Sequence, residues 1–296
     1  MTETELQQFE EHRPVLFAIA YRMLGSVADA EDVVQDAYLA WQKADRTAVH
    51  NPGGWLSTVV TRLSINQLNS ARVRREEYIG QWLPEPLVCP PGASPEENAK
   101  LAESLSMAFL IVLERLSPTE RAVFLLRDVF GYEFHEIALM VEKSEVNCRQ
   151  ILARARKHLG QERPQFDSPG GQSEAVLQKF SQAVMTGDVA GLMLVLAPGV
   201  TVITDGGGKA RAVPRPIIGA ERVVRFFLGA LKKFVPHDRR YRNATINGQP
   251  GVVGYDGDRA VQVLAFAISN DRIESIYVVN NPEKLSHVPD SATPSR

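Results

Sequence analysis

Apolar residues recur at helical spacing through the first 75 residues of the chain. Two of these apolar faces consist of Leu16, Ile19, Ala20 and Met23, followed by Val33, Ala37, Ala40 and Trp41. After a break at Asn51-Pro52-Gly53-Gly54, the same period resumes from Trp55 to Arg75. The pattern predicts that this first segment is all helix.

Helical patterning returns further along the chain. Ala99 to Leu116 reads as one helix, and Ser117-Pro118-Thr119-Glu120 forms a capping box with proline at the first helical position of the next. That helix runs over Arg121 to Phe130 and ends at Gly131. Two further short helices, Tyr132 to Val141 and Ser144 to Leu159, are predicted with a tight turn between them.

Two linker-like stretches separate these parts. Residues 76–97 contain five prolines, which favour an extended, semi-rigid connector: Pro84, Pro86, Pro90, Pro91 and Pro95. A shorter hinge is predicted over residues 164–172, around Ser-Pro-Gly-Gly.

After the second linker the pattern changes to an α+β type. Helices are predicted over 173–186 and 220–234. Strands are predicted over 200–204, 241–246, 251–255, 260–268 and 272–279. Turns at Asp256-Gly257-Asp258 and Ser269-Asn270-Asp271 make the last three strands a meander. We expect helices packed on an antiparallel sheet.

The charges are segregated along the chain although the overall net charge is only −2. Residues 1–45 hold nine acidic and three basic side chains, whereas residues 46–75 hold five arginines and no acid. An acidic helical face followed by a basic one favours two different partners, one basic and one polyanionic. Cys89 and Cys148 have no histidine neighbours at metal-ligand spacing, so we expect no disulfide, metal or cofactor. The chain lacks a bilayer-length apolar run and a signal pattern, which favours a cytoplasmic protein.

The segment Glu133–Leu159 has the form of a helix-turn-helix. Its predicted packing residues are Ile137, Ala138 and Val141 on the first helix and Cys148, Leu152, Ala155 and Leu159 on the second. The residues left to project toward DNA are Ser144, Asn147, Arg149, Gln150, Arg154 and Arg156. An ordinary helical hairpin with a solvated basic face is the alternative.

Three strings resemble regions two and four of extracytoplasmic-function (ECF) sigma factors. They are LGSVADAEDVVQDAYLAWQKA (24–44), NPGGWLSTVVTRLSINQLNSARVRREE (51–77) and LSPTERAVFLLRDVFGYEFHEIALMVEKSEVNCRQILARARKHL (116–159). The resemblance implies core RNA polymerase (its β and β′ subunits) and promoter DNA as partners.

The same resemblance assigns roles to residues. An acidic helix would dock on the polymerase clamp through Asp32, Gln35, Asp36 and Trp41, although Trp41 and Trp55 also fit a role as core anchors. The helix after it would bind and open the minus-10 element through Arg62, Asn66, Asn69, Arg72, Arg74 and Arg75. The helix-turn-helix would read the minus-35 element.

Residues 172–285 resemble the SnoaL-like branch of the NTF2-like fold, a curved sheet and helices around a conical cavity. The strings WLPEPL (82–87), DGGGK (205–209) and NPEKL (281–285) are similar to those of ECF sigma factors with a fused SnoaL-like extension. The implied regulatory interface is Trp82, Leu83, Pro84, Leu87, Asp205, Gly206, Gly207, Gly208, Lys209, Asn281, Pro282, Lys284 and Leu285. The glycine run lacks the Ser or Thr of a phosphate-binding loop, so it predicts a turn that another segment can approach.

The expected protein is thus a sigma factor regulated in cis and not an enzyme. Its expected division is region two (1–76), linker (77–98), region four (99–163), hinge (164–172), SnoaL-like domain (173–286) and a disordered tail (287–296). The alternatives are a cyclase or hydrolase, or a sensor of a small-molecule ligand, fused to a DNA-binding module. For the enzyme, Asp205, Lys209, His237 and Asp256 are the candidate acid–base residues.

Overall fold

The computed structural model describes residues 3–76, 78–89, 104–160 and 171–291, with only the backbone described at 3–5, 46, 71–76 and 171–172. The chain forms two compact units. The first comprises residues 1–77 and 110–163, and the second comprises residues 78–109 and 164–296. Among the described residues, no helix has the length and apolar character needed to span a bilayer.

The first unit begins with the predicted helices. They are α1 (Glu3–Leu24), α2 (Val27–Lys43), the short 3-10 helix η1 (Arg46–Ala48) and α3 (Pro52–Glu76). One difference concerns the predicted break at Asn51 to Gly54. The Asn51 side chain accepts a hydrogen bond from the Gly54 amide at 3.0 Å, and α3 already begins at Pro52. Proline fits the first helical turn, where its missing N–H costs nothing, so the break lies before it.

The second half of the first unit carries α6 (Pro118–Phe124), the π-helix η2 (Leu125–Val129), α7 (Phe134–Val141) and α8 (Glu145–Leu159). The predicted capping box at Ser117 and Glu120 is present. The predicted helix from Ala99 is wrong within the described residues, because α5 spans only Met107–Leu113. The Ser106 hydroxyl accepts a hydrogen bond from the Phe109 amide at 3.3 Å and so caps the helix there. Residues 99–103 lie outside the described part.

The second unit is a seven-stranded sheet in the order β1-β4-β5-β6-β7-β2-β3. The bounds are β1 Val88–Cys89, β2 Leu196–Asp205, β3 Ile217–Ile218, β4 Arg240–Ile246, β5 Gln249–Asp256, β6 Arg259–Ser269 and β7 Arg272–Val279. The predicted meander is confirmed by the antiparallel pairs β5–β6 and β6–β7. The sheet is nevertheless mixed, because β2 runs parallel to β7. A long connection through one helix and four strands separates these two, which leaves the chain free to pair them in parallel.

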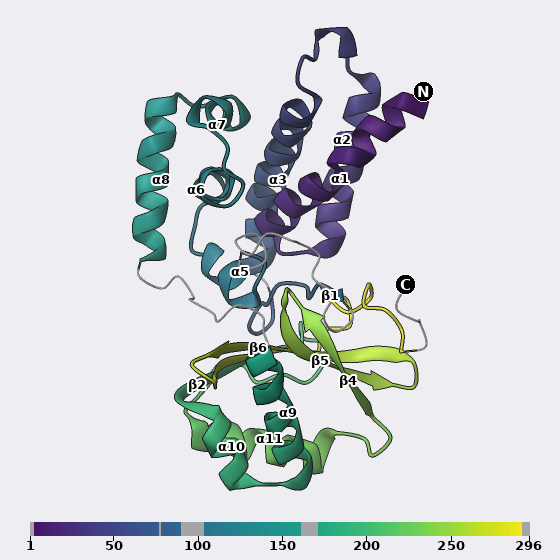
Figure 1. Cartoon of the computed structure of the whole chain (residues 1–296), viewed down its shortest axis with the longest axis vertical. Coiled ribbons are helices and arrows are strands. Elements are labelled where there is room, and N and C mark those ends of the chain that lie inside the picture. The colour runs from purple at the N-terminus through teal and green to yellow at the C-terminus, as the bar shows by residue number, and fades with distance from the viewer. Residues whose placement is uncertain (1–2, 77, 90–103, 161–170, 292–296) are drawn as a thin grey trace. The chain divides into compact units, whose positions relative to one another are not determined.

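Three helices cover one face of this sheet: α9 (Gly171–Thr186), α10 (Val189–Val195) and α11 (Ala220–Phe234) (Figure 1). Their apolar faces and the strands share a core that includes Phe180, Val223, Phe266 and Ile276. α10, β1 and β3 were not predicted, since short segments carry little periodicity. The tail expected to be disordered from residue 287 is ordered as far as Ser291, whose amide donates to the Asp258 carbonyl at 2.9 Å. The predicted class is confirmed: helical regions are followed by an α+β unit.

Candidate functional site

The acidic face of α2 is exposed, whereas its tryptophan is not. Asp32, Gln35 and Asp36 lie at the surface. Trp41 is only 2% exposed and its ring centre lies 5.5 Å from that of Trp55. The surface available to a basic partner therefore consists of the carboxylates and the amide, and Trp41 supports it from the core.

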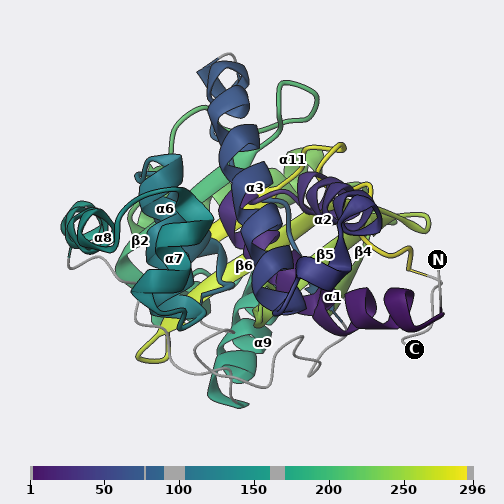
Figure 2. The same cartoon turned by 90° about the horizontal axis from the view of Figure 1, so that it is seen from above.

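The basic helix α3 packs against α7 within the first unit (Figure 2). Arg62 donates to the carbonyls of Leu139 (2.6 Å) and Met140 (3.2 Å) and pairs with Glu142 at 3.0 Å. These carbonyls end a helix, where a cation offsets the negative end of the helix dipole. Arg62 is thus held by the end of α7 in this structure.

The remaining residues predicted to bind DNA from α3 are Asn66, Asn69, Arg72, Arg74 and Arg75. Asn66 and Asn69 are exposed on the helix surface. The backbone of α3 continues to Glu76. The side chains of Arg72, Arg74 and Arg75 lie outside the described residues.

The helix-turn-helix has the predicted form. α7 ends at Glu142, which adopts the left-handed conformation (φ 55°), and the Ser144 hydroxyl caps α8 by accepting from the Asn147 amide at 3.2 Å. The predicted packing residues are buried apart from Ala138, which is half-buried: Ile137, Val141, Cys148, Leu152, Ala155 and Leu159. Ser144, Arg149, Gln150, Arg154 and Arg156 are exposed and Asn147 is half-buried.

Two of these arginines already have acidic partners in the first unit. Arg156 makes a bidentate contact with Asp128 at 3.1 and 2.7 Å, which raises the pKa of the guanidinium further. Arg149 pairs with Glu145 at 3.0 Å and lies over the Phe134 ring at 4.7 Å. Both contacts are exposed, so DNA phosphates can compete for these side chains at low cost.

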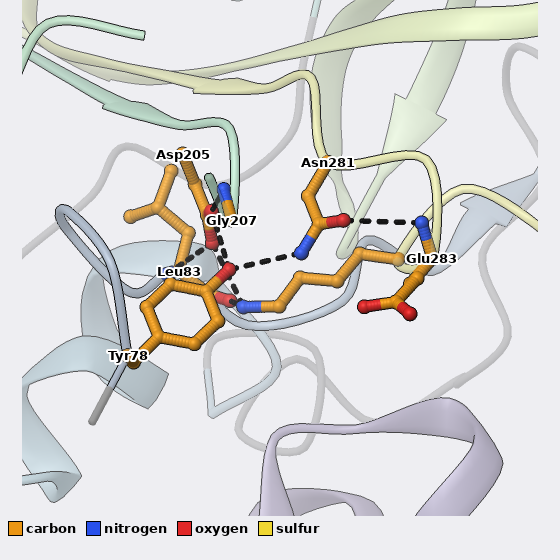
Figure 3. A network of polar contacts seen from close by, with 7 residues as sticks. Tyr78, Leu83, Asp205, Gly207, Asn281 and Glu283 are labelled. Atoms are coloured by element: carbon orange, nitrogen blue, oxygen red, sulfur yellow. Dashed lines mark hydrogen bonds and ion pairs between the residues drawn. The ribbon is translucent and has the colours of Figure 1, made fainter. Parts of the chain in front are cut away.

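The second unit binds the Pro-rich linker through a buried ion pair (Figure 3). Lys284 Nζ lies 2.8 Å from Asp205 Oδ2, with Asp205 fully buried and the Lys284 side chain 8% exposed. The same Asp205 oxygen accepts from the Leu83 amide at 2.9 Å, and Lys284 donates to the Leu83 carbonyl. The pair therefore satisfies both backbone groups of one linker residue. We call these contacts, with those of Tyr78 and Asn281, the linker clamp.

Aromatic residues of the linker complete the linker clamp. The Lys284 ammonium lies 4.4 Å from the Trp82 ring centre and 4.9 Å from that of Tyr78. The Tyr78 hydroxyl donates to Asp205 Oδ1 at 2.6 Å and accepts from the Asn281 amide group at 2.9 Å. Burial, followed by the bond to Asp205, raises the pKa of Tyr78 well above its usual range.

The glycine turn cannot accept side chains without displacing its neighbours. A Cβ on Gly207 (φ 57°) would come within 2.3 Å of Asn281 Nδ2, and one on Gly206 within 2.2 Å of the Ala210 carbonyl oxygen. Gly208 (φ 71°) would meet Ile79 of the linker at 3.0 Å. The close approach predicted for this turn is thus present.

A second contact fixes the far end of the described linker. The side-chain oxygen of Asn247 accepts a hydrogen bond from the Leu87 amide at 3.0 Å, and the backbone amide of Asn247 donates one to the Leu87 carbonyl at 2.8 Å. β1 then pairs with β4. His287 Nε2 lies 2.8 Å from the Pro86 carbonyl oxygen. Tyr78, Asn247 and His287 were missed by the sequence analysis, and their spacing along the chain carried no signal of the contact.

The four candidate acid–base residues are not gathered in one cavity. Asp205 belongs to the linker clamp, Lys209 pairs with Glu283, and Asp256 pairs with Arg239 at 2.7 Å. None of these, nor His237, lines the cavity between the helices and the sheet. The expectation that these four residues could line one cavity as a catalytic set is therefore wrong.

The comparisons with known proteins agree with this layout. Residues 8–74 match sigma-70 region 2 and residues 106–159 match sigma-70 region 4. These two regions define the chain as a sigma-70-type protein.

Relatives are similar over nearly the whole chain. The ECF RNA polymerase sigma factor SigJ of Mycobacterium tuberculosis is 36% identical over 96% of this chain and 94% of its own length. The probable ECF sigma factor SigI of the same organism is 31% identical over 93% of this chain and 92% of its own length. The crystal structure of SigJ superposes with a TM-score of 0.77, at 33% identity, over 98% of this chain and 100% of that one. The chain belongs to the ECF RNA polymerase sigma factors, and the predicted family is confirmed.

Proposed function

We propose that this ECF sigma factor joins core RNA polymerase through α2, engages the minus-10 element with α3 and reads the minus-35 element with α8. It would do so in the cytoplasm, where the polymerase works. The observation that carries the proposal is the pairing of two sigma regions with an exposed acidic α2 and an exposed polar face on α8. Opposite charges steer each surface to a different partner.

The second unit is proposed to regulate this activity through the linker clamp. Residues 78–89 stand between region two and region four in the sequence, and the second unit holds them with the buried Asp205–Lys284 pair. The strength of these linker contacts would determine how freely regions two and four can separate to reach both promoter elements. A change of about 1.4 kcal/mol in the free energy of the contact between the linker and the second unit would change the fraction of active protein roughly tenfold.

An enzymatic role for the second unit receives no support from its cavity. In the described part of the chain, the residues lining the cavity include no Asp, Glu or His. Asp, Glu and His are the side chains that most often perform general acid–base chemistry on a bound substrate. We infer a regulatory role and not a catalytic one.

Polymerase docking can be tested with Asp36→Lys. The reversed charge should weaken binding to core polymerase, most strongly at low salt, because the partner surface is proposed to be basic. Glu10→Lys, an exposed change of equal charge on α1, is the matched control. Affinity is measured by titration of labelled protein with core polymerase. Equal affinities for both variants and the unchanged protein would remove α2 from the interface.

A further inference from the structure

The second unit has a cavity of about 740 Å³, partly open to solvent, between α9, α11 and the sheet. Its walls include Phe180, Phe226, Phe227 and Phe266. Successive ring centres among these residues lie 5.2–5.3 Å apart at steep angles, so edges and faces alternate. A volume of this size with apolar walls suits a small organic molecule.

The charged residues that line the cavity are all arginines: Arg211, Arg239 and Arg259. Arg239 is neutralised by Asp256 at 2.7 and 2.9 Å. For Arg211 and Arg259 the described part of the chain provides no carboxylate partner, and Arg211 lies over the Phe234 ring at 4.4 Å. The cavity therefore joins an aromatic interior to a net positive charge.

A chain of hydrogen bonds holds the arginine segment in place. Tyr241 donates to Gln262 at 3.3 Å, Gln262 donates to Asn280 at 2.9 Å, and Asn280 donates to the Arg211 carbonyl at 2.8 Å. All four residues line the cavity. A polar wall that is already bonded loses little entropy when a ligand arrives.

We propose that this cavity binds an amphipathic organic anion. Its apolar body would lie against the phenylalanine wall, and its acid group, a carboxylate or sulfonate, would pair with Arg211 and Arg259. Arg211 and Arg259 are exposed, so water solvates them when the cavity is empty. An anion can make charge-assisted hydrogen bonds to them that a neutral molecule cannot make, and a cation would be repelled. The proposal concerns binding alone and does not depend on how the linker clamp acts.

The test compares two probes with the same aromatic body, using the full-length protein. The anion 8-anilino-1-naphthalenesulfonate should bind at one saturable site, roughly tenfold more tightly than neutral N-phenyl-1-naphthylamine. The double variant Arg211→Ala with Arg259→Ala should lose this preference and bind both probes within about twofold of each other. Arg215→Ala, which removes an exposed arginine outside the cavity lining, should keep it.

A second variant locates the site. Ala230→Trp places an indole in the cavity and should abolish binding of both probes, while the thermal unfolding temperature checks that the unit is folded. Competition by decanoate, and not by decanol, is the expected result with the unchanged protein. Equal affinity for the two probes, an unaffected double arginine variant, or unchanged binding in folded Ala230→Trp would each overturn the proposal.

Discussion

Lys284 and Asp205 illustrate how one buried pair can organise a segment that has almost no regular structure. Burying two charges is costly, and here the cost is offset by their mutual contact and by bonds to Leu83, Tyr78 and Gly207. Removing one partner leaves the other charged and buried. The pair therefore stabilises the fold only while both residues are present.

Lys284→Met should destabilise the second unit by roughly 3–5 kcal/mol, because Asp205 would lose its counter-ion. Lys209→Met is the control, since it removes an exposed pair with Glu283 beside the same turn and should cost about 1 kcal/mol or less. Chemical denaturation of both variants measures the difference. Equal losses of unfolding free energy in the two variants would mean that the buried Asp205–Lys284 pair stabilises the unit no more than the exposed pair does.

The raised pKa of Tyr78 makes the stability of the folded protein fall as the pH rises above 10. Its pKa is raised in the folded protein by burial and by Asp205, relative to the ordinary value of 10.0. This stabilisation is present below that value and is lost as the pH rises above it, because the unfolded chain loses its proton first. Tyr241, Tyr255 and Tyr277 shift in the same direction. Tyr78→Phe should make the fall in stability between about pH 10 and 12 shallower in urea denaturation, and an identical slope would contradict this assignment.

At the scale of single elements, the proposed function implies that the end of α7 and DNA would compete for Arg62 of α3. If α3 binds the minus-10 element, Arg62 has to leave the carbonyls of Leu139 and Met140 and the carboxylate of Glu142. Glu142→Ala should raise affinity for a single-stranded minus-10 oligonucleotide about twofold, as expected for one exposed ion pair.

Fluorescence anisotropy measures this binding. Glu31→Ala removes another exposed pair, with Arg13, and controls for the change in net charge. An increase no larger than that of Glu31→Ala would mean that the α3–α7 contact does not restrain Arg62.

A separate prediction concerns α8, the helix proposed to read the minus-35 element. Arg149→Ala or Gln150→Ala should cost about 1–3 kcal/mol on the cognate minus-35 sequence and relax discrimination there, because such side chains read base edges. Lys157→Ala, exposed in the last turn of α8, should weaken cognate and scrambled DNA alike through lost phosphate attraction. Equal losses on both sequences for Arg149→Ala and Gln150→Ala would refute the assignment.

The elements also show what periodicity can and cannot predict. α2, α7 and α8 followed directly from apolar spacing, whereas the caps at Ser26 and Ser144 are seen in the structure. The start of α5 at Met107 coincides with the cap made by the Ser106 hydroxyl, a local contact that helical composition does not reveal. The parallel pairing of β2 with β7 has no local signal, because it depends on how distant segments meet.

At the scale of the whole chain, sequence order and compact units do not coincide. Residues 78–109 precede most of region four but belong to the second unit. The strings that resemble the fused sigma factors indicated most of the linker clamp, including Asp205 and Lys284. They did not indicate Tyr78 or Asn247, whose partners lie 127 and 160 residues away in the sequence. Long-range hydrogen bonds of this kind leave no periodic trace.

Run-off transcription with purified core polymerase would show whether this chain acts as a sigma factor that is regulated through the linker clamp. We expect promoter-specific transcripts with the full-length protein, and a change in their amount of roughly tenfold with Trp82→Ala or with truncation after Arg163. Lys209→Met should transcribe as the unchanged protein does. The absence of specific initiation would contradict the assignment of the sigma role to this chain. Wild-type transcription by both Trp82→Ala and the truncated protein would contradict regulation through the linker clamp.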